Sequence, residues 1–224
     1  VKELPALVKS KGISSVLVVT DKGLMGLNLL SGLFEQLDAQ GIKYTVYDGV
    51  QPNPSIENIE EARRLYLKNG CEGIIAFGGG SPMDCAKAAG ARVMNPNQTV
   101  SQMRGELKIR HKLPPFFAVP TTAGTGSETT LAAVVTNMQT HEKYAINDPK
   151  LRPKYAVLDP ELTTGLPQKI TSTTGMDALT HAVEAYIGLS GTKSTDDYAE
   201  RATKLIFENL ETAYNDGKNL QARE

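Results

Sequence analysis

The sequence predicts an α/β fold, in which a doubly wound parallel-sheet domain is followed by the start of an all-helical domain. Short β-branched runs alternate with helical patterns over residues 1–160. This alternation indicates parallel strands that are joined by right-handed crossover helices. After Asp159-Pro160 the pattern changes to helical segments without a convincing strand between them. We therefore expect domains at residues 1–162 and 163–224.

The predicted strands are short and mostly apolar, which is typical of strands that are buried on both faces of a sheet. They are Ser15–Thr20, Lys43–Tyr47, Gly73–Phe77, Phe116–Val119 and Tyr155–Leu158.

Helical spacing of apolar residues follows each early strand. One helix is predicted around Leu27–Leu37, closed by Gly41. A second begins after the turn Gln51–Pro54, with Ser55 as its N-cap, and stops at Asn69-Gly70. A third begins after the third strand. In the second domain the predicted helices are Thr173–Ile187 and Ser194–Tyr214.

Composition excludes several classes of partner. The chain has 24 Lys and Arg against 25 Asp and Glu, a net charge of −1, so no strong positive field recruits nucleic acid or an anionic membrane. No apolar run approaches the length of a membrane span. The two cysteines, Cys71 and Cys85, form neither a metal spacing nor a disulfide framework, which favours a reducing, cytoplasmic setting.

A glycine run, Gly78-Gly79-Gly80, follows the third predicted strand. Ligands bind at the carboxyl ends of strands in open α/β sheets, and glycines let the backbone approach them closely. Ser81 is predicted to cap the next helix, and Asp84 to complete a capping box. The helix N-terminus then suits an anion such as a pyrophosphate. The alternative is a tight strand-to-helix turn without a ligand.

Two further polar motifs carry candidate chemistry. Residues 120–128, Pro-Thr-Thr-Ala-Gly-Thr-Gly-Ser-Glu, form a loop whose hydroxyl groups suit a nucleotide, although such residues are also ordinary turn formers. Asp177 and His181 are four residues apart, so they share one face of a helix and can hold a divalent metal. The alternative is a solvated i,i+4 pair, since two ligands are too few for a complete site. His111 and His141 lie in polar loops and are predicted to be surface histidines.

Together these motifs resemble the iron-containing, group III alcohol dehydrogenases. The resemblance covers essentially the whole chain and is closest to the propanediol, lactaldehyde and methanol oxidoreductase type. It rests on the segments Asp48–Pro54, Gly78–Asp84, Pro120–Glu128, Leu158–Thr163 and Thr174–Tyr186.

The resemblance implies NAD and Fe²⁺ as cofactors, with Zn²⁺ as the alternative metal. It places Gly79, Gly80 and Ser81 on the pyrophosphate, with Asp84 in the same segment. Asp177 and His181 match the first two metal ligands. The remaining implied cofactor contacts are Asp21 beside the adenosine ribose, Thr121, Thr122 and Thr125 on the nicotinamide and ribose side, and Lys143.

The implied reaction is hydride transfer between the nicotinamide and a metal-bound short-chain primary alcohol or diol, or an aldehyde in reverse. The family's other two ligands are histidines further along, and a short strand segment precedes the position of Val1. The chain is therefore expected to be truncated at both ends and inactive alone. The alternatives are a catalytically silent NAD-binding fragment, or an NAD- and metal-dependent enzyme of glycerol dehydrogenase or dehydroquinate synthase type. The expected partners are a small-molecule substrate and further copies of the chain, as a homodimer or larger homo-oligomer.

Overall fold

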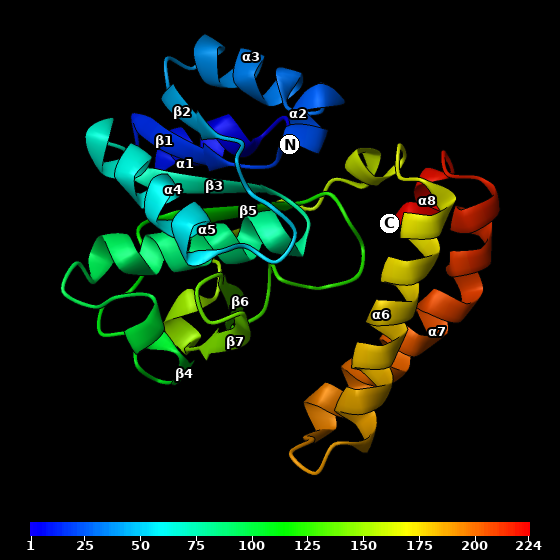
Figure 1. The fold of residues 1–224 in the computed structure, drawn as a ribbon. Helices are drawn as coiled ribbons and strands as arrows, with labels where there is room; N and C mark the ends of the chain where they lie inside the picture. Colours follow the sequence, from blue (N-terminus) through cyan, green and yellow to red (C-terminus); the bar gives the residue numbers. More distant parts are fainter. The chain divides into compact units, whose positions relative to one another are not determined.

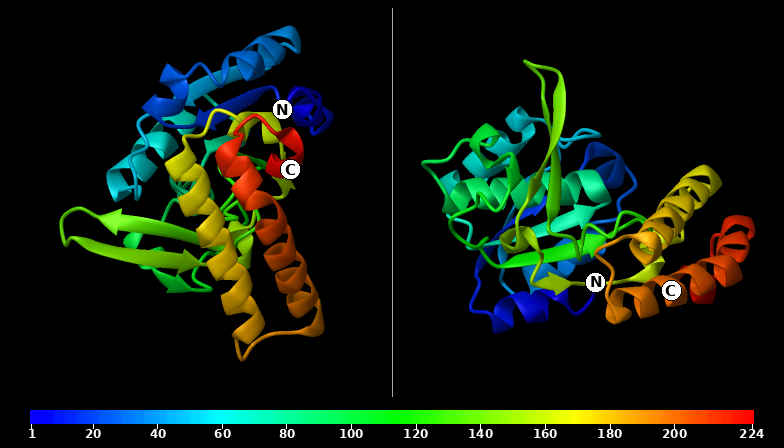
Figure 2. Two further views of the ribbon diagram at one scale, coloured as in Figure 1. Left: turned by 90° about the vertical axis from the view of Figure 1, so that its right-hand side faces the viewer. Right: turned by 90° about the horizontal axis from the view of Figure 1, so that it is seen from below.

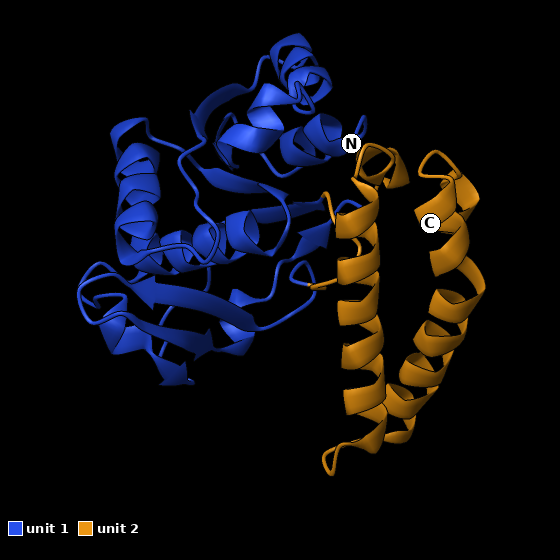
Figure 3. Ribbon diagram, turned by 45° about the vertical axis from the view of Figure 1, so that its right-hand side comes forward, with its two compact units in different colours: residues 1–120, 127–158 blue, residues 121–126, 159–224 orange.

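The computed structural model describes all residues, 1–224, and the chain divides into two compact units (Figure 3). An α/β unit contains residues 1–120 and 127–158, and a helical unit contains residues 121–126 and 159–224. No helix combines the length and the apolar character that a membrane span requires.

The α/β unit is built on a five-stranded sheet in which every neighbouring pair is parallel (Figure 1). The spatial order is β2-β1-β3-β5-β8. This arrangement confirms the predicted doubly wound sheet, although the last strand is shorter than expected. The strands are β1 (Ser15–Val19), β2 (Lys43–Tyr47), β3 (Gly73–Gly78), β5 (Phe116–Pro120) and β8 (Tyr155–Ala156).

Helices cover both faces of this sheet. On one face α4 packs against α5, and on the other α1 packs against α3 (Figure 1). Alternate strand residues such as Leu17 and Val18 therefore point into different cores, and both are fully buried. The helices of this unit are α1 (Leu4–Ser10), α2 (Lys22–Gly26), α3 (Ser31–Ala39), α4 (Ile56–Lys68) and α5 (Gly80–Met94).

The start of α4 follows the sequence prediction. Ser55 Oγ accepts from the Asn58 N–H at 3.3 Å, and the Asn58 side chain accepts from the Ser55 N–H at 3.2 Å. The predicted helix at Leu27–Leu37 is wrong at its start, because Leu27–Leu30 form a turn between α2 and α3 and the helix begins only at Ser31. Asn28 has a φ of 57°, which is incompatible with a continuous right-handed helix, and Leu27 is 69% exposed.

A second, three-stranded sheet was not predicted from the sequence. Its strands are β4 (Gly105–Glu106), β6 (Ala132–Asn137) and β7 (Glu142–Asn147), in the order β4-β7-β6. Strands β6 and β7 form an antiparallel hairpin (Figure 2). His141 lies in its turn with a φ of 55°, so it is an exposed turn residue, as expected for a surface histidine. The polar residues that alternate along β7 give it no continuous apolar run, which is why the sequence pattern did not predict this strand.

The helical unit contains α6 (Gln168–Ile187), α7 (Lys193–Asn215) and the short α8 (Leu220–Arg223). Short 3₁₀ helices occupy Ser101–Met103 and Pro149–Leu151 in the α/β unit, and Pro160–Thr163 in this one. Helices α6 and α7 pack along each other, and Gly175 lies where a larger side chain would overlap Leu210. The loop 121–126 lies against α6, because Gly124 has no side chain to hold it away.

Replacing Gly124 by Ala should destabilise the helical unit. The added Cβ would lie 2.7 Å from both the Cβ and the backbone O of Thr174, and a backbone atom cannot turn aside as the end of a side chain can. We expect a loss of about 1–3 kcal/mol, measured as a lower calorimetric midpoint. Gly165→Ala is the matched control, since nothing lies within 4 Å of its added Cβ. Equal midpoints for the two variants would contradict this packing.

Candidate functional site

The candidate site lies at the carboxyl edge of the parallel sheet, where the direction of chain winding reverses. β1 and β3 are neighbours, but their connections run to opposite sides of the sheet. Val19 is opposite Ala76, so Asp21 and the Gly78-Gly79 pair follow adjacent strand ends. Ligands of open α/β sheets bind at such a switch point.

The three glycines of the run differ in conformation. Gly78 has a φ of 149°, and a Cβ there would lie 2.6 Å from Pro82 Cγ, so this position needs glycine for the turn itself. Gly79 is the extended N-cap of α5, and Gly80 is its first helical residue. The predicted capping box of Ser81 and Asp84 is therefore wrong. The helix begins before Ser81, and no side chain caps it, so the first N–H groups of α5 have no side-chain acceptor at the cap.

Side chains on both flanks of the glycine run are held by hydrogen bonds. Ser81 Oγ accepts from the Asn53 N–H at 3.2 Å, which ties α5 to the turn after β2. Asp21 is the N-cap of α2, and its Oδ1 accepts from the Leu24 N–H at 2.9 Å. The Asp21 carboxylate is therefore fixed beside the end of β1.

Lys87 is fully buried two turns into α5, and sequence reasoning did not single it out. Its Nζ donates to Ser127 Oγ at 3.0 Å, to Thr130 Oγ1 at 3.0 Å, and to the carbonyl oxygens of Thr130 and Ala132 at 3.2 and 3.0 Å. The sequence signal was a lysine inside the run Cys85-Ala86-Lys87-Ala88-Ala89, where a solvated helix face is not expected.

Asp84 belongs to the same buried network. Its Oδ1 accepts from Ser127 Oγ at 2.9 Å, and its Oδ2 accepts from the Val134 N–H at 3.0 Å. Burial raises the pKa of Asp84 above its ordinary value, against the opposing effects of these hydrogen bonds and of Lys87. Burial also lowers the pKa of Lys87 to about 8, although the negative charges of Asp84 and Glu128 act in the opposite direction. Both carboxylate oxygens are thus used inside the protein, and a cofactor contact by Asp84 stays a prediction.

The other predicted cofactor residues are divided between the units. Thr121, Thr122 and Thr125 lie in the loop of the helical unit, which Gly124 fits against α6. Lys143 is exposed on β7 of the α/β unit, next to the buried Tyr144, and its charge lowers the pKa of Asp84. Cofactor contacts by these four residues stay predictions.

The predicted metal ligands share one face of α6. His181 Nε2 lies 3.9 Å from Asp177 Oδ1, and the two side chains are 53% and 46% exposed. In residues 1–224 no group of three or more His, Cys, Asp and Glu side chains is arranged to hold a metal ion. His111 and His141 are exposed in the α/β unit. The pair suits two positions in a coordination sphere, and a closed site needs more.

Comparisons with known proteins match both units of the chain to the same family. Residues 1–160 match the family model described as iron-containing alcohol dehydrogenase, and residues 171–224 match the C-terminal model of the Fe-containing alcohol dehydrogenase family. The chain is 40% identical over 215 residues to 1,3-propanediol dehydrogenase of Klebsiella pneumoniae, covering 95% of this chain and 55% of that protein. It is 36% identical over 224 residues to NAD-dependent methanol dehydrogenase of Bacillus methanolicus, covering 100% of this chain and 58% of that protein.

A solved structure gives the same result. The crystal structure of a 1,3-propanediol oxidoreductase superposes with a TM-score of 0.96 at 38% identity, covering 100% of this chain and 58% of that one. The chain therefore spans little more than half the length of these relatives.

The stability of the chain should depend on the titration of Lys87. Its pKa is about 8 in the fold against an ordinary value of 10.5, so between these values the unfolded chain binds a proton that the folded chain does not. The free energy of unfolding should therefore rise with pH through this window, by on the order of 3 kcal/mol relative to a Lys87→Met variant. Urea titrations of both proteins at a series of pH values measure this difference. Lys68→Met, at an exposed position, should not change the slope. A difference between wild type and Lys87→Met that stays constant or falls with pH would contradict the prediction.

Proposed function

The chain belongs to the iron-containing alcohol dehydrogenase family, and from this premise we propose that it binds NAD and supplies the first metal ligands of an alcohol oxidoreductase. The reaction is hydride transfer between the nicotinamide and a short-chain primary alcohol or diol. The observation that carries the proposal is the glycine run at the head of α5, at the switch point of the sheet and beside Asp21. The relatives named for 1,3-propanediol and methanol support the substrate class.

In this proposal the α/β unit holds the dinucleotide. The N-terminal N–H groups of α5 meet the pyrophosphate, and the helix dipole favours its negative charge. Gly79 and Gly80 carry no side chain that would keep the phosphates away from these groups. Asp21 Oδ1 caps α2, and Oδ2 remains to accept from a ribose hydroxyl group.

We also propose Asp177 and His181 as two ligands of the metal. A bound Fe²⁺ or Zn²⁺ acts as a Lewis acid that lowers the pKa of an alcohol hydroxyl group. The contribution of this chain is to present a carboxylate and an imidazole from one face of α6, four residues apart. The threonine loop, with Thr121, Thr122 and Thr125, would contact the nicotinamide and ribose.

The proposal also includes a cellular compartment and an oligomeric state for the whole protein. Cys71 and Cys85 are free and buried, which suits a reducing cytoplasm. The family resemblance favours a homodimer or a larger homo-oligomer. The reaction partner is a small-molecule alcohol or aldehyde.

Asp21 should make the chain prefer NADH to NADPH. A carboxylate accepts from a ribose 2′-hydroxyl group but repels a 2′-phosphate. Asp21→Asn removes the charge and keeps an oxygen for the cap of α2, so the fold should survive. We expect the variant to reduce the ratio of NADH affinity to NADPH affinity by about tenfold or more, as measured by fluorescence titrations with both cofactors. Tighter binding of NADPH by the wild type would refute the assignment.

Gly80→Val should abolish NADH binding without unfolding the protein. Gly80 does not have a positive φ, so its backbone conformation accepts a side chain. The valine side chain should instead occupy the space where the pyrophosphate binds and so prevent NADH binding. Gly78→Ala is the contrasting variant, because its Cβ collides with Pro82 and should lower the thermal midpoint. A Gly80→Val variant that melts early would mean that the run is only a structural turn.

Metal binding by the 224-residue chain should be weak. With two protein ligands the ion keeps most of its waters, so dialysis against a mild chelator should leave the chain metal-free and unable to oxidise short alcohols. His181→Ala should remove the residual binding measured by titration with Fe²⁺ and leave NADH affinity unchanged, whereas His111→Ala should affect neither. Stoichiometric, chelator-resistant metal would show that the ligands are misplaced.

A further inference from the structure

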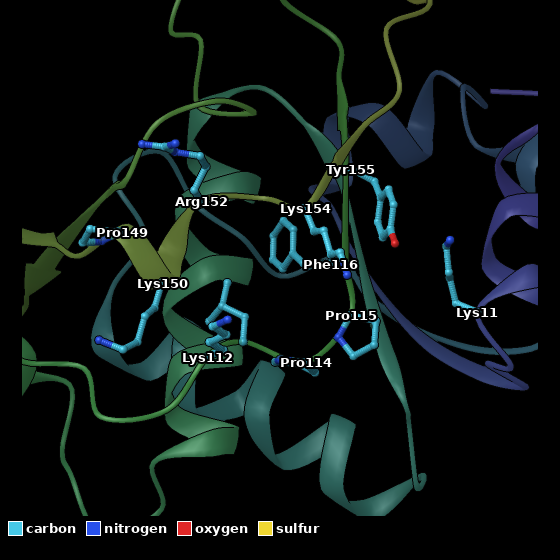
Figure 4. Close-up of a pocket in the computed structure, with 11 residues that line it drawn as sticks. Lys11, Lys112, Pro114, Pro115, Phe116, Pro149, Lys150, Arg152, Lys154 and Tyr155 are labelled. Atoms are coloured by element: carbon cyan, nitrogen blue, oxygen red, sulfur yellow. The ribbon is translucent and has the colours of Figure 1, made fainter.

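A cationic cavity of about 690 Å³ lies in the α/β unit, at the amino edge of the parallel sheet (Figure 4). Phe116 is the first residue of β5 and Tyr155 is the first of β8, and both line it. The glycine run follows the opposite, carboxyl end of β3, which is parallel to β5. The cavity is therefore separate from the candidate cofactor site, and a ligand bound there would not depend on the proposed function.

Five cations line this cavity, and no aspartate or glutamate does. They are Lys11, Lys112, Lys150, Arg152 and Lys154. The whole chain has 24 cationic and 25 acidic side chains, so an acid-free group of five is a local departure from a balanced composition. The cations come from the end of α1 and from later parts of the chain, which only the fold brings together.

Most of this charge is not neutralised within the protein. Lys150 Nζ lies 3.4 Å from Asp148 Oδ1, but Asp148 is fully buried and its carboxylate also accepts from the N–H groups of Ile109 and Lys150. Lys11, Lys112, Arg152 and Lys154 form no ion pair. Like charges that share a cavity repel one another, and a bound anion relieves that repulsion.

Tyr155 holds two of the ammonium groups at the cavity. Lys11 Nζ lies 5.3 Å from the centre of its ring and Lys154 Nζ lies 5.7 Å from it (Figure 4). The ring itself is stacked on Phe117 at 5.1 Å, so it is fixed from β5. Cation–π contacts reduce the freedom of long side chains without neutralising their charge.

The rest of the lining is apolar and rigid. Leu113, Pro114, Pro115 and Phe116 form a continuous segment of it, and proline has no N–H group to donate. Recognition of an anion must therefore come from the ammonium and guanidinium groups, while carbon atoms of a ligand can lie on the apolar segment. The volume is within the range of small-molecule sites.

We propose that this cavity binds a small phosphate ester that carries two or more phosphate charges. The cations bind the phosphates, and the segment Leu113–Phe116 contacts the organic part. A membrane surface bears the same phosphate chemistry, but a concave site of this size suits a soluble molecule better than a flat layer.

Calorimetric titration of the chain with inorganic triphosphate tests the proposal. At low ionic strength we expect binding below about 1 mM that weakens as salt is added. The triple variant Lys11→Gln, Lys112→Gln, Lys154→Gln should lose at least about tenfold in affinity. The control variant Lys68→Gln, Lys193→Gln, Lys218→Gln changes the net charge equally at exposed positions outside the cavity and should bind as the wild type does.

Two further arms exclude other sources of binding. Gly80→Val should still bind triphosphate, because it alters only the glycine run at the other edge of the sheet. If this variant loses triphosphate binding, the anion binds at the cofactor site and the proposal is overturned. Vesicles of phosphatidylcholine with phosphatidylserine should not bind the chain; vesicle binding without triphosphate binding would overturn it as well. Equal triphosphate affinity in the two triple variants would also overturn it.

Discussion

The buried ammonium group of Lys87 holds α5 to the segment that leads into β6, and the geometry of the candidate cofactor site depends on it. It has four oxygen acceptors within 3.2 Å and no exposure to solvent. A buried charge is tolerated only while its partners stay in place. Asp84, one turn earlier, is engaged with Ser127 and Val134, so a displacement of α5 would break the hydrogen bonds of two charged groups together. The direction of α5, and of its N-terminal N–H groups, is thereby fixed.

Because the direction of α5 is fixed, the three glycines at its start can be assigned different roles. Gly78 is needed for the turn, because its backbone conformation and the nearby Pro82 both exclude a side chain. Gly79 and Gly80 are the cap and the first residue of the helix, where a side chain is compatible with the backbone. A run that looks uniform in the sequence therefore separates into one structural position and two positions that leave the end of the helix open. This difference lets folding and binding be tested separately.

The parallel sheet gives its two edges different characters. At the carboxyl edge the helix N-terminus and Asp21 combine a partial positive charge with a single carboxylate, which suits a dinucleotide. At the amino edge five cations surround an apolar segment without an acidic side chain. In the two proposals both edges bind phosphate, but one would use backbone N–H groups in close approach and the other would use long side chains. The first is shape-selective, and the second depends more on charge and ionic strength.

Features that depend on short stretches of chain were predictable from the sequence: the alternating strands and helices, the Ser55 cap, and the shared face of Asp177 and His181. These follow from the periods of strands and helices and from hydrogen bonds between near neighbours. The fold alone decided the partners of Lys87, which lie 40 or more residues away, and the gathering of cations around Tyr155. Contacts of that separation leave no period in the sequence, because they depend on how strands and helices pack.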